Sequence, residues 1–438
     1  MEIKINHQPR GSVLAVTLLA VIVIGLALAS YLVLATNVSS NVARSQSWNN
    51  AIPVLEAGIE EALTHINYNG IDVNGFAQNR WNLDATDRLY HKTRMFSDNS
   101  YYDVSIEAVD PPVIISRGYV PTPLGSTVYV TRKVRVGTKR QSLGSGGITA
   151  KGKISFSGSS YVDSFDPSTT TNGLYSTSVR HDKGMVLSNL ASGEAIHLDQ
   201  TDIYGTVKTG SGGTVTYTSG AVGDAAWIAA GNTGVEAGHS ASDAAVQFDA
   251  VSAGYSSGLS PLNTGGLVGG TNYTYVVNGA LNQNYYLDNK LTISGGQSLA
   301  VTGGNVKLYV TGDFTTSGSG YVYLAPGASL ELYVGGKLTI SGSGVVNGSG
   351  TVNGESPAHN LSVYSTSTTT GIQWTYSGSA AFIGTVYAPY AAFTLSGSAG
   401  ATGTLSANTV ILSGGASVHF DESLGSAGAY VVMSWNEI

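Results

Sequence analysis

The sequence begins with an uncharged apolar run that limits what the chain can be. Residues Ser12 to Leu34 read SVLAVTLLAVIVIGLALASYLVL, with only scattered polar or small side chains among aliphatic ones. About 23 helical residues, each rising about 1.5 Å, span roughly 35 Å, enough to cross a hydrocarbon core of about 30 Å. The run therefore predicts a membrane-spanning helix over about residues 12–34.

The residues around this run predict its orientation. Lys4 and Arg10 precede it, against Glu2, and nearly all of the chain follows it. The positive-inside bias places the short basic end in the cytoplasm and the rest outside. The alternative is a secretory signal cleaved near Ala29 or Ala35, but signal peptides have a shorter apolar region.

Composition indicates a β-rich envelope protein. Charged residues make up only 11 % of the 438 residues, and 57 residues are Gly. Val, Leu, Ile and Tyr recur at strand-like spacing, so the chain is not of the disordered type. Its length predicts two or more folded units after the anchor.

Charge and cysteine content exclude several functions. A net charge of −7 argues against a nucleic-acid partner, because phosphate binding needs a basic face. The chain has no cysteine, which excludes disulfides, thiolate metal sites and a cysteine nucleophile. No cofactor is expected from the sequence.

The helical pattern continues beyond the apolar run. The segment AIPVLEAGIEEALTHI, residues 51–66, places apolar side chains on one helical face. These apolar positions are Ile52, Leu55, Ile59, Ala62, Leu63 and Ile66. One helix over residues 12–67 is therefore predicted, with Pro53 as a possible bend and the Asn67–Gly70 turn as its end.

A leader ending in Gly11, the apolar helix directly after it, and the EAGIEEAL segment resemble PilX-type minor pilins of type IV pilus systems. The resemblance implies cleavage after Gly11 by a prepilin peptidase, with Ser12 as the new N-terminus. Major pilins carry Glu and Pro at the fifth and twenty-second mature positions, where this chain has Val16 and Val33. That difference favours a minor, tip-located or membrane-retained subunit over a bulk subunit.

The segment from residue 68 to 143 is expected to form a small α+β head. Charged residues from Arg80 to Arg94 indicate a loop and helix region, and two alternating runs follow at Tyr101–Val109 and Val128–Val136. We expect these two runs to pair antiparallel and to pack on the outer part of the long helix.

Repeats dominate residues 144–438. Leu308–Gly320 matches Leu332–Gly344 at most positions, an offset of 24 residues. Ser-Gly turns recur after short apolar runs at Ser157, Ser294, Ser377, Ser396 and Ser413. Spacings of roughly 17 to 24 residues predict a parallel β-solenoid. A β-sandwich is the alternative, although it does not repeat the side-chain pattern. Residues 168–283 are less regular, so long loops or irregular coils are expected there.

The end of the chain adds a second resemblance. Phe382–Tyr390 and Val418–Leu424, together with Ser157–Asp166, resemble the β-solenoid domain of uncharacterised function that follows PilX-type N-termini. This implies an architecture without implying chemistry. The expected fold is mainly β: a basic leader (1–11), a long N-terminal transmembrane α-helix (12–67), a pilin-like α+β head (68–143) and a C-terminal parallel β-solenoid, or β-helix (144–438).

Two acidic pairs are candidate sites. Asp163 and Asp166 in VDSFDP either flank a groove or bind a cation, or else form Asx-type turns before Pro. His419 and Asp421 lie two residues apart near the chain end, where polar groups also serve to cap a solenoid.

A third candidate is His197, Asp199 and Asp202 in IHLDQTD. His197 and Asp199 fall on one strand face and are suitable metal ligands, but a solvated loop edge is the plainer interpretation. Parallel β-helices include polysaccharide-cleaving enzymes, whose sites need converging carboxylates. In the most regular region, residues 289–353, the acids are only Asp313 and Glu331, at different points of the repeat. No catalytic or metal-ligating residue is therefore assigned.

Two further groups of side chains are open to more than one interpretation. A basic run suits either an anionic surface polymer or a partner pilin, or is a solvated strand face. It comprises Arg132, Lys133, Arg135, Lys139 and Arg140. Aromatic residues near the end either stack on sugars or fill the solenoid interior. They are Trp374, Tyr376, Tyr387 and Tyr390.

The sequence thus predicts a non-enzymatic structural protein, a minor pilin or pseudopilin-like subunit that presents a β-solenoid for adhesion or filament assembly. Its expected partners are other pilin-like subunits or the pilus assembly machinery, and the membrane, with a surface glycan as a further candidate. The expected location is the inner membrane, with most of the chain outside, or a surface pilus. The alternative function is a membrane-tethered β-helix that binds or cleaves glycans.

Overall fold

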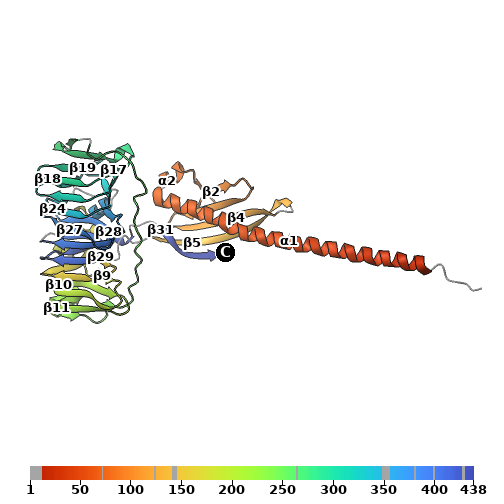
Figure 1. Cartoon of the computed structure of the whole chain (residues 1–438), viewed down its shortest axis with the longest axis horizontal. Helices are drawn as coiled ribbons and strands as arrows, with labels where there is room; N and C mark the ends of the chain where they lie inside the picture. Colours follow the sequence, from red (N-terminus) through yellow and green to blue (C-terminus); the bar gives the residue numbers. More distant parts are fainter. Residues whose placement is uncertain are drawn as a thin grey trace, which may run out of the picture. The chain divides into compact units, whose positions relative to one another are not determined.

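The computed structural model describes residues 12–71, 73–122, 125–140, 146–262, 265–347, 356–378, 381–397, 400–426 and 430–438. The chain divides into two compact units (Figure 1). The head unit comprises Met1–Arg140 and Ala429–Ile438, and the stacked unit comprises Gln141–Gly428. The last strand thus belongs to the head, whereas the expected division assigned residues 430–438 to the solenoid.

The head unit is one six-stranded antiparallel sheet with two helices. The helices are α1 (Ser12–Tyr68) and α2 (Val73–Gln78). The strands, in sheet order, are β1 (Asn82–Leu83), β2 (Tyr90–Met95), β3 (Tyr101–Glu107), β4 (Val113–Thr122), β5 (Gly125–Arg140) and β31 (Tyr430–Glu437). Every pairing in this sheet is antiparallel.

Two expectations for the head were wrong. The runs at 101–109 and 128–136 do not pair with each other, because β4 lies between β3 and β5. β4 was not predicted from the sequence because Gly118 and Pro121 interrupt its alternation of apolar and polar residues. Lys92 and Arg94 lie on strand β2 and not in a helix or loop.

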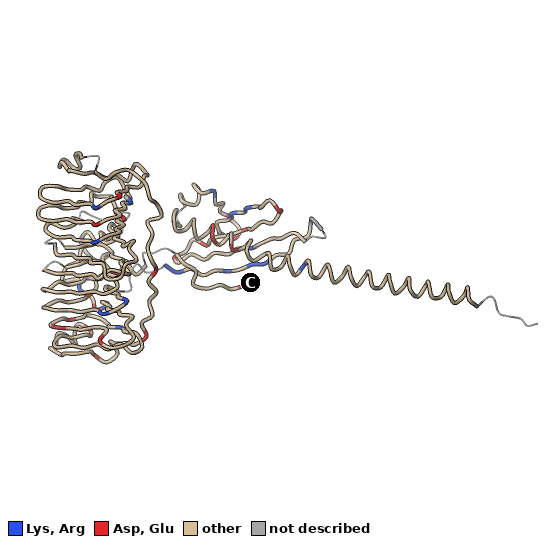
Figure 2. Tube along the Cα trace, viewed as in Figure 1, with Lys and Arg blue, Asp and Glu red and all other residues tan. Residues whose placement is uncertain are grey.

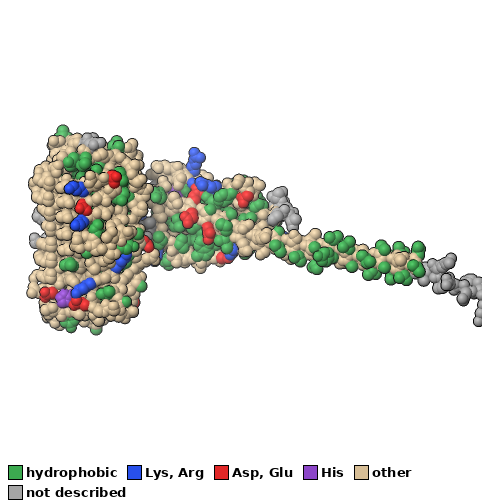
Figure 3. All heavy atoms as spheres, viewed as in Figure 1, with side chains coloured by type: hydrophobic (Ala, Val, Ile, Leu, Met, Phe, Trp, Pro, Cys, Tyr) green, Lys and Arg blue, Asp and Glu red, His purple; other side chains and the backbone are tan. Residues whose placement is uncertain are grey.

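Helix α1 confirms the predicted long helix and extends it by one residue. It runs for 57 residues with Pro53 inside it. From Val13 to Leu34 its large apolar side chains are 52–77 % exposed. Figure 2 shows no charged residue along this projecting part, and Figure 3 shows apolar side chains around it. By length and composition α1 is able to span a membrane.

The second part of α1 forms the core of the head. Leu55 and Ile59 are at most 3 % exposed and belong to the same buried cluster as Ile114 on β4 and Val136 on β5. The helix lies very close to β4. A Cβ atom added to Gly118 would lie 2.5 Å from the Ala51 carbonyl oxygen, so only Gly fits there.

Gly118→Ala is expected to destabilise the head by about 1–3 kcal/mol, because the added methyl group meets the backbone of α1, which cannot move without repacking. Gly25→Ala is the matched control, since nothing lies within 4 Å of a Cβ added there. Amide exchange of α1 and β4 in the full chain in detergent measures the difference. Equal protection in the two variants would contradict the close helix-sheet contact.

Strand β31 closes the head at its β5 edge. It pairs with β5 from Tyr430↔Arg140 to Glu437↔Val134. The Tyr430 backbone N–H donates to Oδ1 of Asn67 on α1 at 2.7 Å, and Nδ2 of Asn67 donates to the Tyr430 carbonyl at 3.1 Å. The Tyr430 ring is 4 % exposed, and its hydroxyl donates to Asp110 at 2.9 Å. The head core is therefore completed from the far end of the chain.

Most strands of the stacked unit pair in parallel and form rows, although Gly266–Val268 and Thr271–Tyr273 pair antiparallel. Leu308 pairs with Leu332 and Tyr309 with Tyr333, so the 24-residue offset seen in the sequence is also the pairing offset. Strands β28 (Phe382–Ser396), β29 (Ala401–Ser413) and β10 (Gly193–Thr209) each take part in more than one row. These shared strands connect the pairings into one closed, barrel-like arrangement.

The remaining strands of the stacked unit are short. In the first half they are β6 (Gly147–Ala150), β7 (Ile154–Ser157), β8 (Ser160–Phe165), β9 (Gly184–Ser188), β11 (Gly213–Gly223), β12 (Gly234–Val235) and β13 (Ser240–Ala241), with helix α3 (Ala225–Ala229). In the second half they are β14 (Gly266–Val268), β15 (Thr271–Tyr273), β16 (Tyr275–Asn278), β17 (Tyr285–Leu287), β18 (Leu291–Ser294), β19 (Ser298–Thr302), β20 (Asn305–Val310), β21 (Phe314–Ser317), β22 (Tyr321–Leu324), β23 (Ser329–Val334), β24 (Leu338–Gly342), β25 (Val345–Val346), β26 (Leu361–Ser365), β27 (Ile372–Gly378) and β30 (Val418–Asp421).

The chain enters and leaves this stack at neighbouring strands. β29 pairs with β6 and β7, and β30 pairs with β8, so the last strands lie beside the first ones. Between the two halves a long extended segment, residues 242–262, runs along the stack (Figure 1, green). The expected irregularity of residues 168–283 lies mostly in this segment and in the 166–183 loop, because β9, β10 and β11 are paired strands, although three register shifts interrupt the β10–β11 pairing.

One continuous core fills the stacked unit. It extends from Ile148 to Val418 and includes Phe156, Leu308 and Trp374, each at most 1 % exposed. Inward and outward side chains alternate on most strands, as on β23, so the outer surface is set by every second residue. The polar side chains discussed next lie on these outward positions or in the loops.

Candidate functional site

The densest polar cluster of the stacked unit surrounds Asp163, which is fully buried. His419 on β30 is the direct cross-strand partner of Asp163 on β8, and its Nδ1 donates to Asp163 Oδ1 at 2.7 Å. The 166–183 loop supplies two more donors to Oδ2, the Tyr175 hydroxyl at 2.7 Å and Arg180 Nε at 2.8 Å. We call these four residues the Asp163 cluster.

Aromatic rings enclose this cluster. The Tyr175 ring stacks on His419 with centroids 3.6 Å apart, and the Arg180 guanidinium lies 4.7 Å from the Tyr161 ring and 4.3 Å from the Tyr204 ring. Burial, and then the hydrogen bond to Asp163, raise the pKa of Tyr175, so it remains a neutral donor. Burial opposes the charge of Arg180, but Tyr175 and Asp163 outweigh that effect and raise its pKa.

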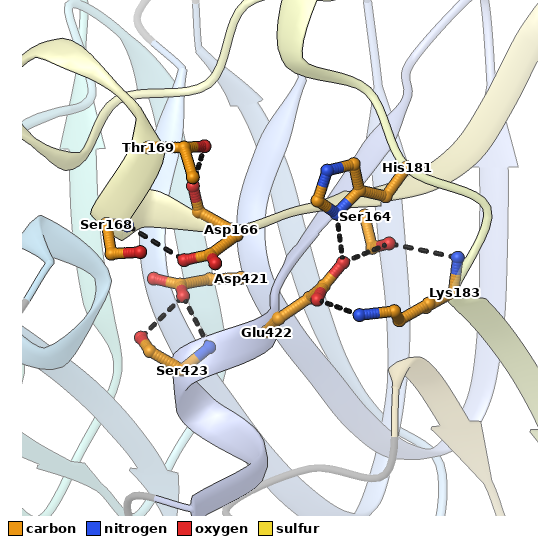
Figure 4. Close-up of polar contacts among 9 residues, drawn as sticks. All are labelled: Ser164, Asp166, Ser168, Thr169, His181, Lys183, Asp421, Glu422 and Ser423. Carbon is orange, nitrogen blue, oxygen red and sulfur yellow. Dashed lines mark hydrogen bonds and ion pairs between the residues drawn. The ribbon is translucent and has the colours of Figure 1, made fainter.

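Glu422 forms a second cluster on the same strands (Figure 4). It lies directly after β30, and its carboxylate accepts from Lys183 Nζ at 2.6 Å, His181 Nδ1 at 2.8 Å and the Ser164 hydroxyl at 3.0 Å. Ser164 and His181 also form an antiparallel bridge through their backbones. Burial acts to raise the pKa of Glu422, but the hydrogen bonds outweigh it and the pKa lies below its usual value of 4.5.

This pKa shift predicts a pH dependence of stability. Because the folded state lowers the pKa of Glu422, the stabilisation is complete above about pH 4.5 and is lost as pH falls below that value. Glu422→Gln should therefore cost about 2 kcal/mol of unfolding free energy at pH 7 and much less at pH 3. Denaturant unfolding at the two pH values measures this. A cost independent of pH would contradict it, and Glu56→Gln, at an exposed position of α1, is the charge-matched control.

The other acids here are also fully engaged. Asp421 is buried, accepts from the backbone N–H of Ser423 at 3.0 Å, and accepts a hydrogen bond from the Ser356 hydroxyl. Asp166 accepts from the backbone N–H of Ser168 at 2.9 Å, the Asx-type turn named as the plainer interpretation. Hydrogen bonds from the Ser168 side chain and backbone lower the pKa of Asp166.

These hydrogen bonds hold the 166–183 loop against the stacked strands. They also occupy the carboxylate oxygens that a catalytic acid or base would need free. The two oxygens of Asp163 already accept three hydrogen bonds and the carboxylate is buried, so it is not placed to take a proton from a substrate. Neither Asp163 nor Asp166 belongs to a group of three close metal-ligand atoms among the described residues. The structure instead brings together Asp163 of the first candidate pair and His419 of the second, which are hydrogen-bonded to each other.

The third candidate set is not brought together as a ligand set. His197 and Asp199 share the outward face of β10, as expected, but His197 Nδ1 lies 2.9 Å from the Thr216 hydroxyl and 3.0 Å from Glu194. The Asp199 carboxylate lies 3.5 Å from the Ser219 hydroxyl. Asp202 lies apart, and burial raises its pKa. His197 and Asp199 thus contact side chains of β10 itself and of the paired strand β11.

One group of three possible metal ligands does occur in the described residues, in the head. Asp84, Asp87 and His91 have ligand atoms within 4.8 Å of one another. Both aspartates are exposed, and each accepts a backbone N–H two residues ahead, from Thr86 at 2.7 Å and from Leu89 at 3.0 Å. This is the pattern of two successive Asx turns, and nothing else marks it as a metal centre.

The aromatic candidates divide into two kinds. Trp374 and Tyr376 are at most 1 % exposed and fill the interior, and burial raises the pKa of Tyr376 to about 12. Tyr387 and Tyr390 lie on the outside and are covered in part by other groups. Tyr387 donates to the carbonyl of Asp249 in the extended segment, and Lys151 Nζ lies 3.9 Å from the Tyr390 ring centroid.

The processing residues lie at the edge of the described chain. Gly11 is outside the described residues, and Ser12 begins α1. The sequence analysis missed Tyr175, Arg180 and Glu422 as members of the polar clusters. No spacing or motif distinguishes them. Tyr175 and Arg180 reach Asp163 through the irregular 166–183 loop, and Glu422 meets Ser164 and His181 through the pairing of distant strands.

Comparison with known proteins gives a partial match. Residues 263–427 match a protein family described as a domain of unknown function (DUF7305), which covers less than half of the 438 residues and lies within the stacked unit. No curated protein matches the chain. Among solved structures, the chain is similar to the competence-associated pilin ComZ from Thermus thermophilus, at 10 % identity and a TM-score of 0.23, covering 90 % of this chain and 97 % of that one. A TM-score this low carries no argument about fold or function.

Proposed function

We propose that this chain is a structural protein of the cell envelope, a minor-pilin-like subunit anchored by the first part of α1. One observation carries the proposal: a single 57-residue helix passes from a fully apolar, exposed segment into the core of an antiparallel head. An apolar surface of this extent needs lipid or neighbouring subunits to cover it. The head and the stacked unit then lie outside the cytoplasm, with Lys4 and Arg10 inside.

The proposal favours a minor or tip-located subunit over a bulk one. Val16 occupies the fifth position after Gly11, so no carboxylate is available in this part of the helix to pair with a neighbour's terminal amine. Moreover, α1 has no charged residue before Arg44, so the side chains of this part form no ion pairs with neighbouring subunits.

The processing step provides the direct test. Intact mass and N-terminal sequencing of the protein from its native cells should show loss of Met1 to Gly11 and a chain that begins at Ser12. A chain that retains Met1, or one cut near Ala35, would overturn the pilin route. A Gly11→Leu variant should retain its leader and disappear from any sheared filament fraction, while Gly25→Leu, within the helix, should still be processed.

We propose that the stacked unit is a parallel β-solenoid and that each row of paired strands is one of its faces. Strands follow one another by about one repeat in each row: β17 pairs with β20, β20 with β23 and β23 with β26. The closure of the pairing network arises from long strands that turn a corner. In β28 the pairing residues shift between Ala388 and Ala392, which separates two rows on one strand. A solenoid is thus compatible with the closed pairing.

Deleting one repeat distinguishes a solenoid from a barrel. Removal of residues 308–331 joins Lys307 to Leu332. Leu332 is the pairing partner of Leu308 on the next strand of the same row, so it takes the place of Leu308. A solenoid should fold with one coil fewer, because each coil contacts only its neighbours, whereas a barrel needs every strand to close. Removal of residues 308–319, half a repeat, is the control and should abolish the fold. Amide exchange of β26 and β29 measures both, and failure of the full-repeat deletion would count against the solenoid.

The proposal assigns no catalytic role. Its support is that the acids of the Asp163 and Glu422 clusters are saturated by donors from their own chain. Glycan cleavage, the alternative from the sequence, finds no unoccupied carboxylate pair among those described at these clusters. The stacked unit supplies length and a large outer surface.

A further inference from the structure

Three tyrosines cluster on the face of the head sheet opposite α1. Tyr101 on β3 and Tyr119 on β4 are direct cross-strand partners, and their rings stack with centroids 4.2 Å apart and planes 8° apart. Tyr129 on β5 meets both rings edge-on, at 5.3 Å from Tyr101 and 6.4 Å from Tyr119. All three are partly exposed, so the cluster forms an aromatic surface patch with a rim of hydroxyl groups, in which Tyr129 stands edge-on to the stacked pair.

Basic side chains continue this surface along β5. The pairing register places Arg117 of β4 opposite Lys133 of β5, on the same face as the tyrosines. Arg135 and Lys139 follow at alternate positions of β5, while the intervening Val134 and Val136 point into the core. At about 3.4 Å per residue the three β5 cations extend over roughly 20 Å.

Among the described residues, the acids of the head neutralise these four cations only in part. Elsewhere in the basic run Arg132 pairs with Glu437 at 2.6 Å, and Arg140 lies over the Tyr430 ring at 4.4 Å. On the outer face, Arg135 and Glu107 approach only to 3.9 Å. Asp103 is the other acid that the register places on this face, against the four cations. The outer face thus keeps a positive excess in a chain whose net charge is −7.

We propose that this outer face of the head sheet binds an acidic polysaccharide. The sugar rings lie on the tyrosine cluster, and the sugar carboxylates contact Arg117, Lys133, Arg135 and Lys139. Sugar rings offer apolar faces to aromatic rings and hydroxyl groups to the tyrosine rim. A carboxylate accepts charge-assisted hydrogen bonds from Arg and Lys. The proposal does not require the pilin role, because the site lies wholly within the head.

A polysaccharide fits this face better than a nucleic acid does. Tyr101 and Tyr119 stack on each other, so a base cannot insert between them. A DNA duplex also carries about one negative charge per 1.7 Å, which cations at alternate positions of one strand, about 7 Å apart, do not match. A polymer with one carboxylate per sugar matches a short row of cations more closely.

The test is binding of fluorescent polygalacturonate, a polymer of sugar carboxylates, to the full chain in neutral detergent. Lys133→Gln with Lys139→Gln should weaken binding about tenfold, and raising the salt concentration should weaken the wild type toward the same level. Tyr129→Ser should weaken binding as well, with circular dichroism to show that the head remains folded.

The matched control is Lys290→Gln with Lys337→Gln, which changes the net charge equally at two exposed lysines of the stacked unit. This control should bind as the wild type does. Unchanged binding in the Lys133 and Lys139 variant, or equal loss in the control, overturns the site. Equal binding of neutral dextran overturns the role of the cations. Tighter binding of oligothymidylate than of polygalacturonate overturns the occupant in favour of a nucleic acid.

Discussion

Tyr430→Ala is expected to detach β31 from the head and to cost about 3–5 kcal/mol of unfolding free energy, as for other buried aromatic residues. The Tyr430 ring is 4 % exposed in the core that α1 shares with β5. Without the ring, the paired hydrogen bonds between the Tyr430 backbone and Asn67 lose the packing that holds them in place. The far end of the chain would then no longer cover the β5 edge.

Amide exchange of β5 in the full chain measures this effect locally, apart from the unfolding of the stacked unit. Tyr430→Phe is the matched control. It keeps the ring and loses only the hydroxyl hydrogen bond to Asp110, so it should cost about 1 kcal/mol. Equal protection of Val134 and Val136 in wild type and Tyr430→Ala would show that β31 is dispensable for the head.

Asp163→Asn is expected to cost about 3–5 kcal/mol, the range found when one partner of a buried ion pair is removed. The carboxylate accepts from His419, Tyr175 and Arg180, and it is the counter-charge of Arg180 at 2.8 Å. An amide keeps the size but offers one acceptor oxygen in place of two. Arg180 would be left without its ion-pair partner between two tyrosine rings.

Asp166→Asn provides the comparison. Asp166 is partly exposed at its Asx turn, and an amide oxygen can accept the Ser168 backbone hydrogen bond, so a loss under 1 kcal/mol is expected. Limited proteolysis of the 166–183 loop and denaturant unfolding report the two variants. If the two substitutions lower the unfolding free energy equally, the Asp163 cluster does not hold the loop in place.

Local sequence patterns predicted those parts of the fold that depend on near neighbours. The apolar run and the periodic Leu55 and Ile59 predicted α1 nearly to its end, because a helix is defined by contacts four residues apart. The repeat at Leu308 and Leu332 also predicted a pairing register, because strands of similar sequence stack on one another one repeat apart.

Long-range pairing was not predictable in this way. β31 joins the head across a gap of about 290 residues, and its sequence, YVVMSWNE, resembles any other strand of the chain. Likewise, β29 meets β6 only because the chain returns along the stack, which no repeat period reveals. Asp163 was a candidate beside Asp166, but its actual partner, His419, is 256 residues away and is brought near by β30 pairing with β8.

The place of the stacked unit within the chain has a mechanical consequence. It is inserted between β5 and β31, and the residues at its two junctions, Arg140 and Tyr430, are direct partners in the head sheet. A pull on the stacked unit is therefore divided between two backbone connections, where a domain appended at one end would hang from one. The two strands are drawn in the same direction, so the load falls on the β4–β5 ladder and on Asn67. A chain built in this way resists traction on its stacked unit without a disulfide.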